Sequence, residues 1–93
     1  MRQYELVTIL PSEEPEFLKG KESVAAELTQ FGATDVKEED MGDRPLMYPI
    51  KKRQRGHYVL YRISLEPQSV APMEKAFKIN PNILKYLLVK QEA

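Results

Sequence analysis

The stretch DMGDRPLMYPIKKRQRGHYVLYRISL, residues 40–65, predicts a β-hairpin with a basic tip. Residues 58–65 are rich in aromatic and β-branched side chains, which favour a half-buried strand. Leu46, Tyr48 and Ile50 alternate, as one face of a strand does. Between these two runs the chain carries four cations and no acid, at Lys51, Lys52, Arg53 and Arg55. A tip of this charge is suited to contact a negatively charged partner.

The residues before the hairpin predict a strand, a helix and a second strand. Residues 2–10 alternate as a strand, and Pro11 ends it. Ser12 is the expected N-cap of a helix that Gly32 stops. The second strand spans about 33–48, and Gly42 marks a β-bulge within it. Pro45 and Pro49 lack an N–H group, which predicts an edge strand.

The residues after the hairpin predict a helix and a last strand. The third strand covers 57–66, and a helix follows at about 69–79, with Pro72 in its first turn. Residues 83–89 form the last strand. The order β-α-β-β-α-β predicts a four-stranded antiparallel sheet, order 4-1-3-2, with both helices on one face. The expected core residues are Tyr4, Leu6, Val24, Leu28, Val59, Tyr61, Ile63, Met73 and Phe77.

The opposite face of this sheet has no helix over it in the predicted topology. It carries a contiguous patch, for which we expect a protein partner because large exposed apolar patches mark interaction sites. The residues of this expected protein-partner face are Val7, Ile9, Tyr58, Leu60 and Arg62.

Length and composition indicate one α+β domain over residues 1–93. Of the 93 residues 42% are hydrophobic, which suffices for one modest core. Fourteen basic and fourteen acidic residues balance, so the chain is not a bulk polycation, although a local basic patch is possible. There is no cysteine, no apolar run of about 20 residues and no signal-peptide pattern. We therefore expect a cytoplasmic protein that does not enter a membrane.

The sequence carries no constellation typical of catalysis. His57 is the only histidine, and no His, Cys and acid cluster has the spacing of a metal site. We expect no enzyme activity, catalytic residue, cofactor, metal or small-molecule substrate. Residues 55–60 share a basic residue and a glycine with the RNA-recognition-motif strand, but the aromatic positions do not match. Stacking of two bases on the sheet is therefore not expected.

Several blocks resemble the bacterial small-subunit ribosomal protein six (S6) family. The most specific is Leu46-Met-Tyr-Pro-Ile-Lys-Lys52, between the second and third strands. The start Met1-Arg-Gln-Tyr-Glu5, the segment 39–44, the pair Gly56 and Tyr58, and the ending 82–90 are also similar. The resemblance covers essentially the whole chain.

The resemblance implies a ferredoxin-like fold and a structural role in the small ribosomal subunit. It also implies pairing with ribosomal protein eighteen (S18) and binding of the pair to the central domain of small-subunit rRNA. Three departures stand at Met41, Pro45 and Lys85, where the family often has an aromatic residue, a ladder donor and an arginine. The positions expected near RNA are Arg2, Lys52, Arg53, Arg55, Lys85 and Lys90.

Two hypotheses from other classes compete with this one. The chain could be a ferredoxin-like regulatory or dimerisation domain that self-associates through its open sheet face. It could also be an acylphosphatase-like enzyme, which needs an arginine in an anion-binding loop after the first strand. The segment Pro11-Ser-Glu-Glu14 is acidic instead, which argues against the enzyme.

Overall fold

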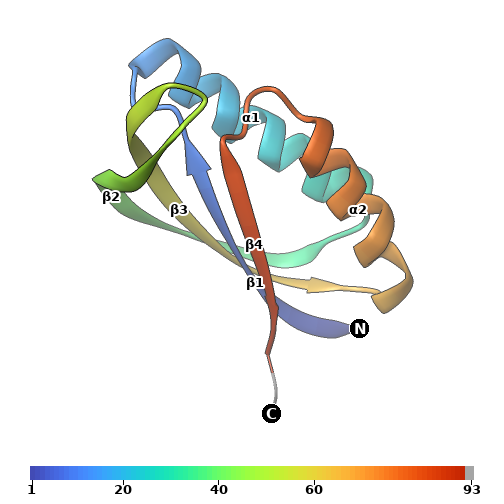
Figure 1. The fold of residues 1–93 in the computed structure, drawn as a ribbon. Helices are drawn as coiled ribbons and strands as arrows, with labels where there is room; N and C mark the ends of the chain where they lie inside the picture. The colour runs from blue at the N-terminus through green and yellow to red at the C-terminus, as the bar shows by residue number, and fades with distance from the viewer. Residues whose placement is uncertain (92–93) are drawn as a thin grey trace.

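The computed structural model describes residues 1–91 as six elements (Figure 1). In chain order these are β1 (Arg2–Leu10), α1 (Glu14–Gln30), β2 (Thr34–Ile50), β3 (Arg53–Leu65), α2 (Pro67–Ile79) and β4 (Lys85–Lys90). The strands form one antiparallel sheet in the order β2-β3-β1-β4. This is the predicted topology, with β1 and β3 in the centre, and the predicted single domain extends two residues beyond the described part.

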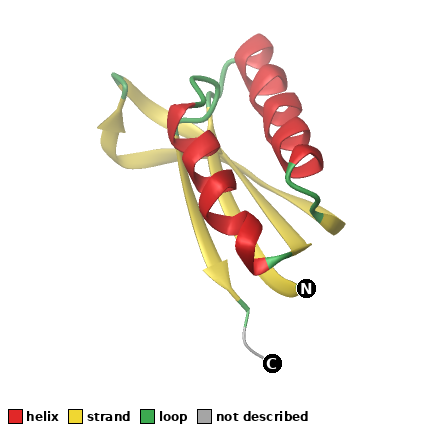
Figure 2. Ribbon diagram, turned by 90° about the vertical axis from the view of Figure 1, so that its right-hand side faces the viewer, coloured by secondary structure: helices red, strands yellow, loops and turns green. Residues whose placement is uncertain are grey.

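Both helices pack against the same face of the sheet, as Figure 2 shows. Side chains of a strand point alternately to its two faces, and in β1 those of Tyr4, Leu6 and Leu10 are buried beneath the helices. This apolar face of the sheet is what the helices cover. All nine predicted core residues are buried, joined by Leu10, Leu65 and Ile83 in one cluster. The other face, which we call the open face, is covered by no helix of residues 1–91.

The predicted bulge is confirmed at Gly42. Asp40 pairs with Val59 and Gly42 pairs with Tyr58, so Met41 is the extra residue. Gly42 has φ 89, a left-handed conformation that glycine adopts without strain. The carboxylate of Asp40 accepts a hydrogen bond of 2.8 Å from the Gly42 N–H, which fixes the bulge.

The basic loop predicted at the hairpin tip is shorter than expected. Ile50 pairs with Arg53, so only Lys51 and Lys52 form the turn. Their φ angles of 50 and 66 are those of a type I′ turn, whose twist matches that of two paired strands. Arg53 and Arg55 therefore belong to β3, where alternation and not loop flexibility decides their direction.

Two helix starts differ from the sequence prediction. The N-cap of α1 is Glu13 rather than Ser12, because the Ser12 hydroxyl donates to Asp43 on β2 instead. Helix α2 begins two residues early, at Pro67, which places Pro72 inside the helix and not in its first turn. Proline at the first helical position is favourable, since its missing N–H group has no partner there.

Candidate nucleic-acid and protein interface

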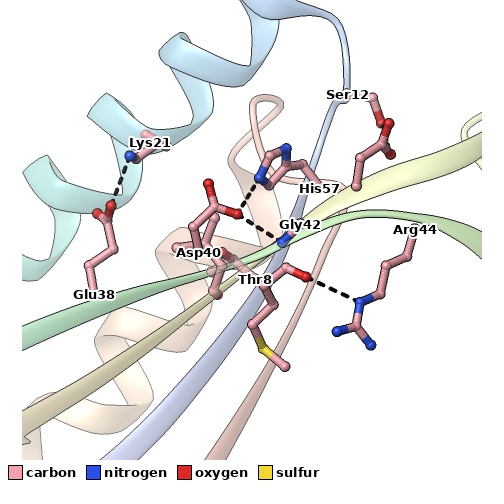
Figure 3. Close-up of polar contacts among 11 residues, drawn as sticks. Thr8, Ser12, Lys21, Glu38, Asp40, Gly42, Arg44 and His57 are labelled. Carbon is pink, nitrogen blue, oxygen red and sulfur yellow. Dashed lines mark hydrogen bonds and ion pairs between the residues drawn. The ribbon is translucent and has the colours of Figure 1, made fainter.

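A cluster of side chains joins α1 to the hairpin arm, by which we mean 38–50 of β2 with 53–58 of β3 (Figure 3). The ring of Phe17 stacks on His57, with 4.0 Å between the ring centroids. His57 Nε2 lies 2.5 Å from Asp40 Oδ1. The hydrogen bonds from His57 and from the Gly42 N–H lower the pKa of the Asp40 carboxyl. The arm is therefore held to the helix by its only histidine.

A second contact of the same junction lies one helical turn further along α1. Lys21 Nζ is 2.8 Å from the Glu38 carboxylate. A dashed line marks this ion pair in Figure 3. Glu38 pairs with Tyr61 across the two strands. Burial, with the negative charge of Glu38 as a smaller cause, raises the pKa of the Tyr61 hydroxyl. Neither residue of the ion pair is available as a free charge for a partner.

The two arginines of β3 at the hairpin, Arg53 and Arg55, point toward the helix layer. Arg53 makes a 2.5 Å ion pair with Glu13, and Arg55 lies 3.4 Å from Asp43. The hydroxyl of Ser12 donates to Asp43 at 2.9 Å, and this bond, with the nearby Arg55 charge, lowers the pKa of Asp43. Both predicted RNA contacts are thus neutralised by acids of this chain.

The predicted lysines of the same end are differently placed. Lys52 is exposed in the turn, and Lys85 is exposed on β4 opposite Ile9 of the open face. Neither has an ion pair among residues 1–91. The structure therefore leaves these two charges, with Lys51 between the strands, on the hairpin end of the molecule.

Arg2 and Lys90 lie at the other end of the sheet. Arg2 pairs with Leu65 and Lys90 pairs with Tyr4, so both follow the helix-side alternation. Lys85 and Lys90 are five residues apart on one strand, which is about 17 Å at the usual rise. The six predicted RNA contacts consequently fall into two groups at opposite ends of the sheet.

The predicted protein-partner face lies on the open face, with one correction. Register places Val7 opposite Leu60 and Ile9 opposite Tyr58. Leu60 is only 8% exposed, so it offers little area to a partner. Arg62 is exposed and lies 3.4 Å from Glu5.

The structure adds two residues to this face that sequence reasoning missed. Leu87 and Val89 of β4 lie on the open face and are 60% and 45% exposed. Leu87 pairs with Val7, which makes it a continuation of the predicted patch. The alternation of Lys85, Leu87 and Val89 could have found them, because three alternating positions share one face.

A hollow of about 160 Å³ lies where the arm meets the open face. Arg44 from β2 covers the Tyr58 ring nearby, with 6.0 Å between the guanidinium carbon and the ring centroid. We call this space the hairpin hollow, and its lining consists of Ile9, Leu46, Met47, Tyr48, Ile50, Tyr58 and Lys85.

Within residues 1–91, no group of three or more His, Cys, Asp or Glu side chains is placed to hold a metal ion. Over the same residues, no helix has the length and apolar character needed to cross a membrane.

The amino-acid sequence is similar to those of a known protein family. A family model described as "Ribosomal protein S6" matches residues 3–90. The chain belongs to the ribosomal protein S6 family. The small ribosomal subunit protein bS6 of Treponema denticola is 40% identical over 92 residues, which is 99% of each chain. The protein of the same name from Treponema pallidum is 33% identical over the full length of both.

A solved structure of the S6 family has the same fold. Ribosomal protein S6 from Thermotoga maritima superposes with a TM-score of 0.83 and covers 97% of this chain and 87% of that one. The two sequences are 24% identical, so this likeness concerns the fold. The ferredoxin-like order expected from the resemblance is confirmed.

Proposed function

We propose that this chain is a structural, non-catalytic constituent of the small ribosomal subunit, and that it binds central-domain rRNA together with S18. The observation that carries the proposal is the S6 family match over residues 3–90. We place the protein in the cytoplasm, on the ribosome. No cofactor and no small-molecule substrate takes part in this role.

The charges at the hairpin end support RNA contact by Lys52 and Lys85 more strongly than by Arg53 and Arg55. Lys52 and Lys85 are exposed and without an acid partner in the described chain, so their charge is free for phosphate. Arg53 and Arg55 would first have to leave Glu13 and Asp43. Arg2 and Lys90 offer a second contact at the other end, which requires RNA that reaches along the sheet.

The chain's neutrality explains why a partner protein would be needed. Scattered phosphate contacts position a protein without reading sequence, and few of them give only weak binding. The open face would bind S18 through Val7 and Leu87, with Leu60 between the flanking strands and Arg62 at the margin. Ile9 and Tyr58 would lie at the border between this contact and the hairpin hollow. The complex would then present two basic surfaces to the RNA.

Titration of central-domain RNA with and without S18 tests the RNA contacts. We expect Lys52→Ala/Lys85→Ala to weaken binding and to lower the slope of log affinity against log salt by about two units. The matched control is Lys19→Ala/Lys75→Ala, which removes the same charge from exposed helix positions. Equal affinity and slope for wild type and the Lys52/Lys85 variant would show that these lysines are solvated surface.

Binding of S18 without RNA tests the open face. Leu87→Asp should weaken S18 binding more than about ten-fold, because an anion would enter an apolar contact. Leu87 is a better probe than buried Leu60, since its exposure lets the fold survive the change. Ile79→Asp on α2, where the side chain is 80% exposed, is the matched control. If the face serves self-association instead, Leu87→Asp will abolish a dimer and leave S18 binding unchanged.

A further inference from the structure

A four-residue excursion of β2 stands beside the hairpin hollow. Pro45 pairs with Arg55 and Ile50 with Arg53, so residues 46–49 all face the single position 54. Met47 is 92% exposed and Tyr48 is 76% exposed, so neither contributes to the core. Pro45 and Pro49 restrict the backbone on both sides of the pair. These two large side chains are held out in the solvent by a segment whose backbone the prolines restrict, so little further backbone entropy is lost when a partner binds.

The hollow combines aromatic and apolar walls with uncompensated positive charge. Tyr48 and Tyr58 line it together with Ile9, and Lys85 is the one charged residue of the lining. Lys51 and Lys52 follow Ile50 directly in the turn. None of these three lysines has an ion pair within residues 1–91. Arg44, which covers the Tyr58 ring, has no ion pair within these residues either. In a chain of zero net charge, this is a local excess of four positive charges next to two phenol rings.

This combination suits a nucleotide better than a protein side chain. Interface cores between proteins are enriched in tyrosine and methionine, but they are depleted of lysine. A protein partner would therefore have to bring acids to the same spot. An unpaired nucleotide brings a π-face for a tyrosine and a phosphate on each side of its base.

We propose that the hairpin hollow receives one unpaired base of the bound RNA, stacked on Tyr48, with its flanking phosphates at Lys85 and at the Lys51–Lys52 turn. The inference rests on the proposed RNA-binding function and assigns a nucleotide class to one part of its surface. It adds a contact to an unpaired base to the phosphate contacts. It also gives a role to Tyr48, whose exposed side chain does not contribute to the core.

The test compares wild type, Tyr48→Phe and Tyr48→Ala bound to central-domain RNA in the presence of S18. Tyr48→Ala should weaken binding roughly 5-fold to 150-fold, the range for loss of one stacked base. Tyr48→Phe should bind like wild type, because stacking needs the ring and not the hydroxyl. The salt slope should stay the same in both, because no phosphate contact is lost. Ile79→Ala, another exposed apolar residue, is the control and should change nothing.

Chemical probing of the RNA at saturating protein locates the base. One unpaired nucleotide should be protected by wild type and by Tyr48→Phe, and should be reactive with Tyr48→Ala. Making that nucleotide abasic should weaken wild type by the same factor as Tyr48→Ala, and should not weaken Tyr48→Ala further.

Three results would overturn the inference, and they differ in what else they remove. If Tyr48→Ala binds RNA as wild type does and protects the same nucleotides, the hollow holds no base, and the proposed function stands. If Tyr48→Ala weakens S18 binding without RNA and leaves the protection pattern unchanged, the hollow is a protein contact. If wild type with S18 does not bind the RNA at all, the proposed function fails and the inference falls with it.

Discussion

Gly56 lies where the structure has no room for a side chain. It follows the open-face alternation of β3, opposite Arg44, and is buried. A Cβ atom placed there would overlap the Cγ2 methyl of Ile9 and lie 3.3 Å from Cδ2 of Leu46. Ile9 and Leu46 both line the hairpin hollow. The absence of a side chain at Gly56 lets both of them pack directly on the β3 backbone.

Gly56→Ala should lower the free energy of unfolding by about 1–3 kcal/mol, the usual cost of an added methyl in a packed site. The β-branched Ile9 side chain is stiff and cannot turn aside easily. Urea denaturation of the purified chain measures the loss. The same change in an Ile9→Ala background should cost less, because the obstructing methyl is gone. An equal loss in both backgrounds would contradict the steric explanation.

At the scale of elements, the hairpin arm depends on α1 as much as on its own strand pairing. The arm is contacted from the two residues before α1 and from its first two turns, by Ser12, Glu13, Phe17 and Lys21. Their partners on the arm are 31, 40, 40 and 17 positions away in the chain. These contacts fix the part of the hairpin arm from which residues 46–49, with Tyr48, project.

The link between Asp40 and His57 predicts a pH dependence of stability. The lowered pKa of Asp40 means that its contribution is fully present above its unfolded pKa of about 3.9 and is lost as pH falls through the lower folded value. Asp40→Ala should therefore be less stable than wild type at about pH 6, and the difference should become smaller at about pH 2.5, where more of the Asp40 carboxyl is protonated. Because the carboxylate is half exposed, we expect the difference to be below about 1 kcal/mol.

Urea midpoints at the two pH values measure this difference without added salt. Glu39→Ala is the matched control, since it removes a neighbouring carboxylate of β2 that has no ion pair or side-chain hydrogen bond in the described chain. A gap between Asp40→Ala and wild type that is undiminished at low pH would mean that packing, and not the carboxylate charge, is what the mutation removes.

The elements themselves were predictable from the sequence because local signals and hydrophobic alternation agreed. The prolines of β2 independently indicated the edge position that the topology requires. The helix start at Glu13 was not predictable, because Ser12 forms a bond to Asp43, 31 positions away. The ion pairs of Arg53 and Arg55 were also not predictable, because their acid partners are distant in the sequence. The two arginines face these acids only because the turn has two residues, which places both arginines in β3.

At the scale of the whole molecule, the sheet order decides which charges act together. The six cations predicted to contact RNA come from three segments of the sequence. Only the strand register shows that Lys85 lies at the hairpin end while Lys90 lies with Arg2. Two basic ends on one short sheet are suited to a partner that is extended. A compact anion could reach only one of them.

The pairing of the first strand with the last also bears on how the chain is made. β1 is a central strand, with β3 on one side and β4 on the other. A growing chain emerges from the N-terminus at roughly 5–20 residues per second, so β1 is released first. It cannot complete its ladder until Lys85–Lys90, which are synthesised after the other five elements, are also free. The sheet therefore cannot close before β4 has been made, and until then a strand with apolar residues on both faces keeps one edge unpaired.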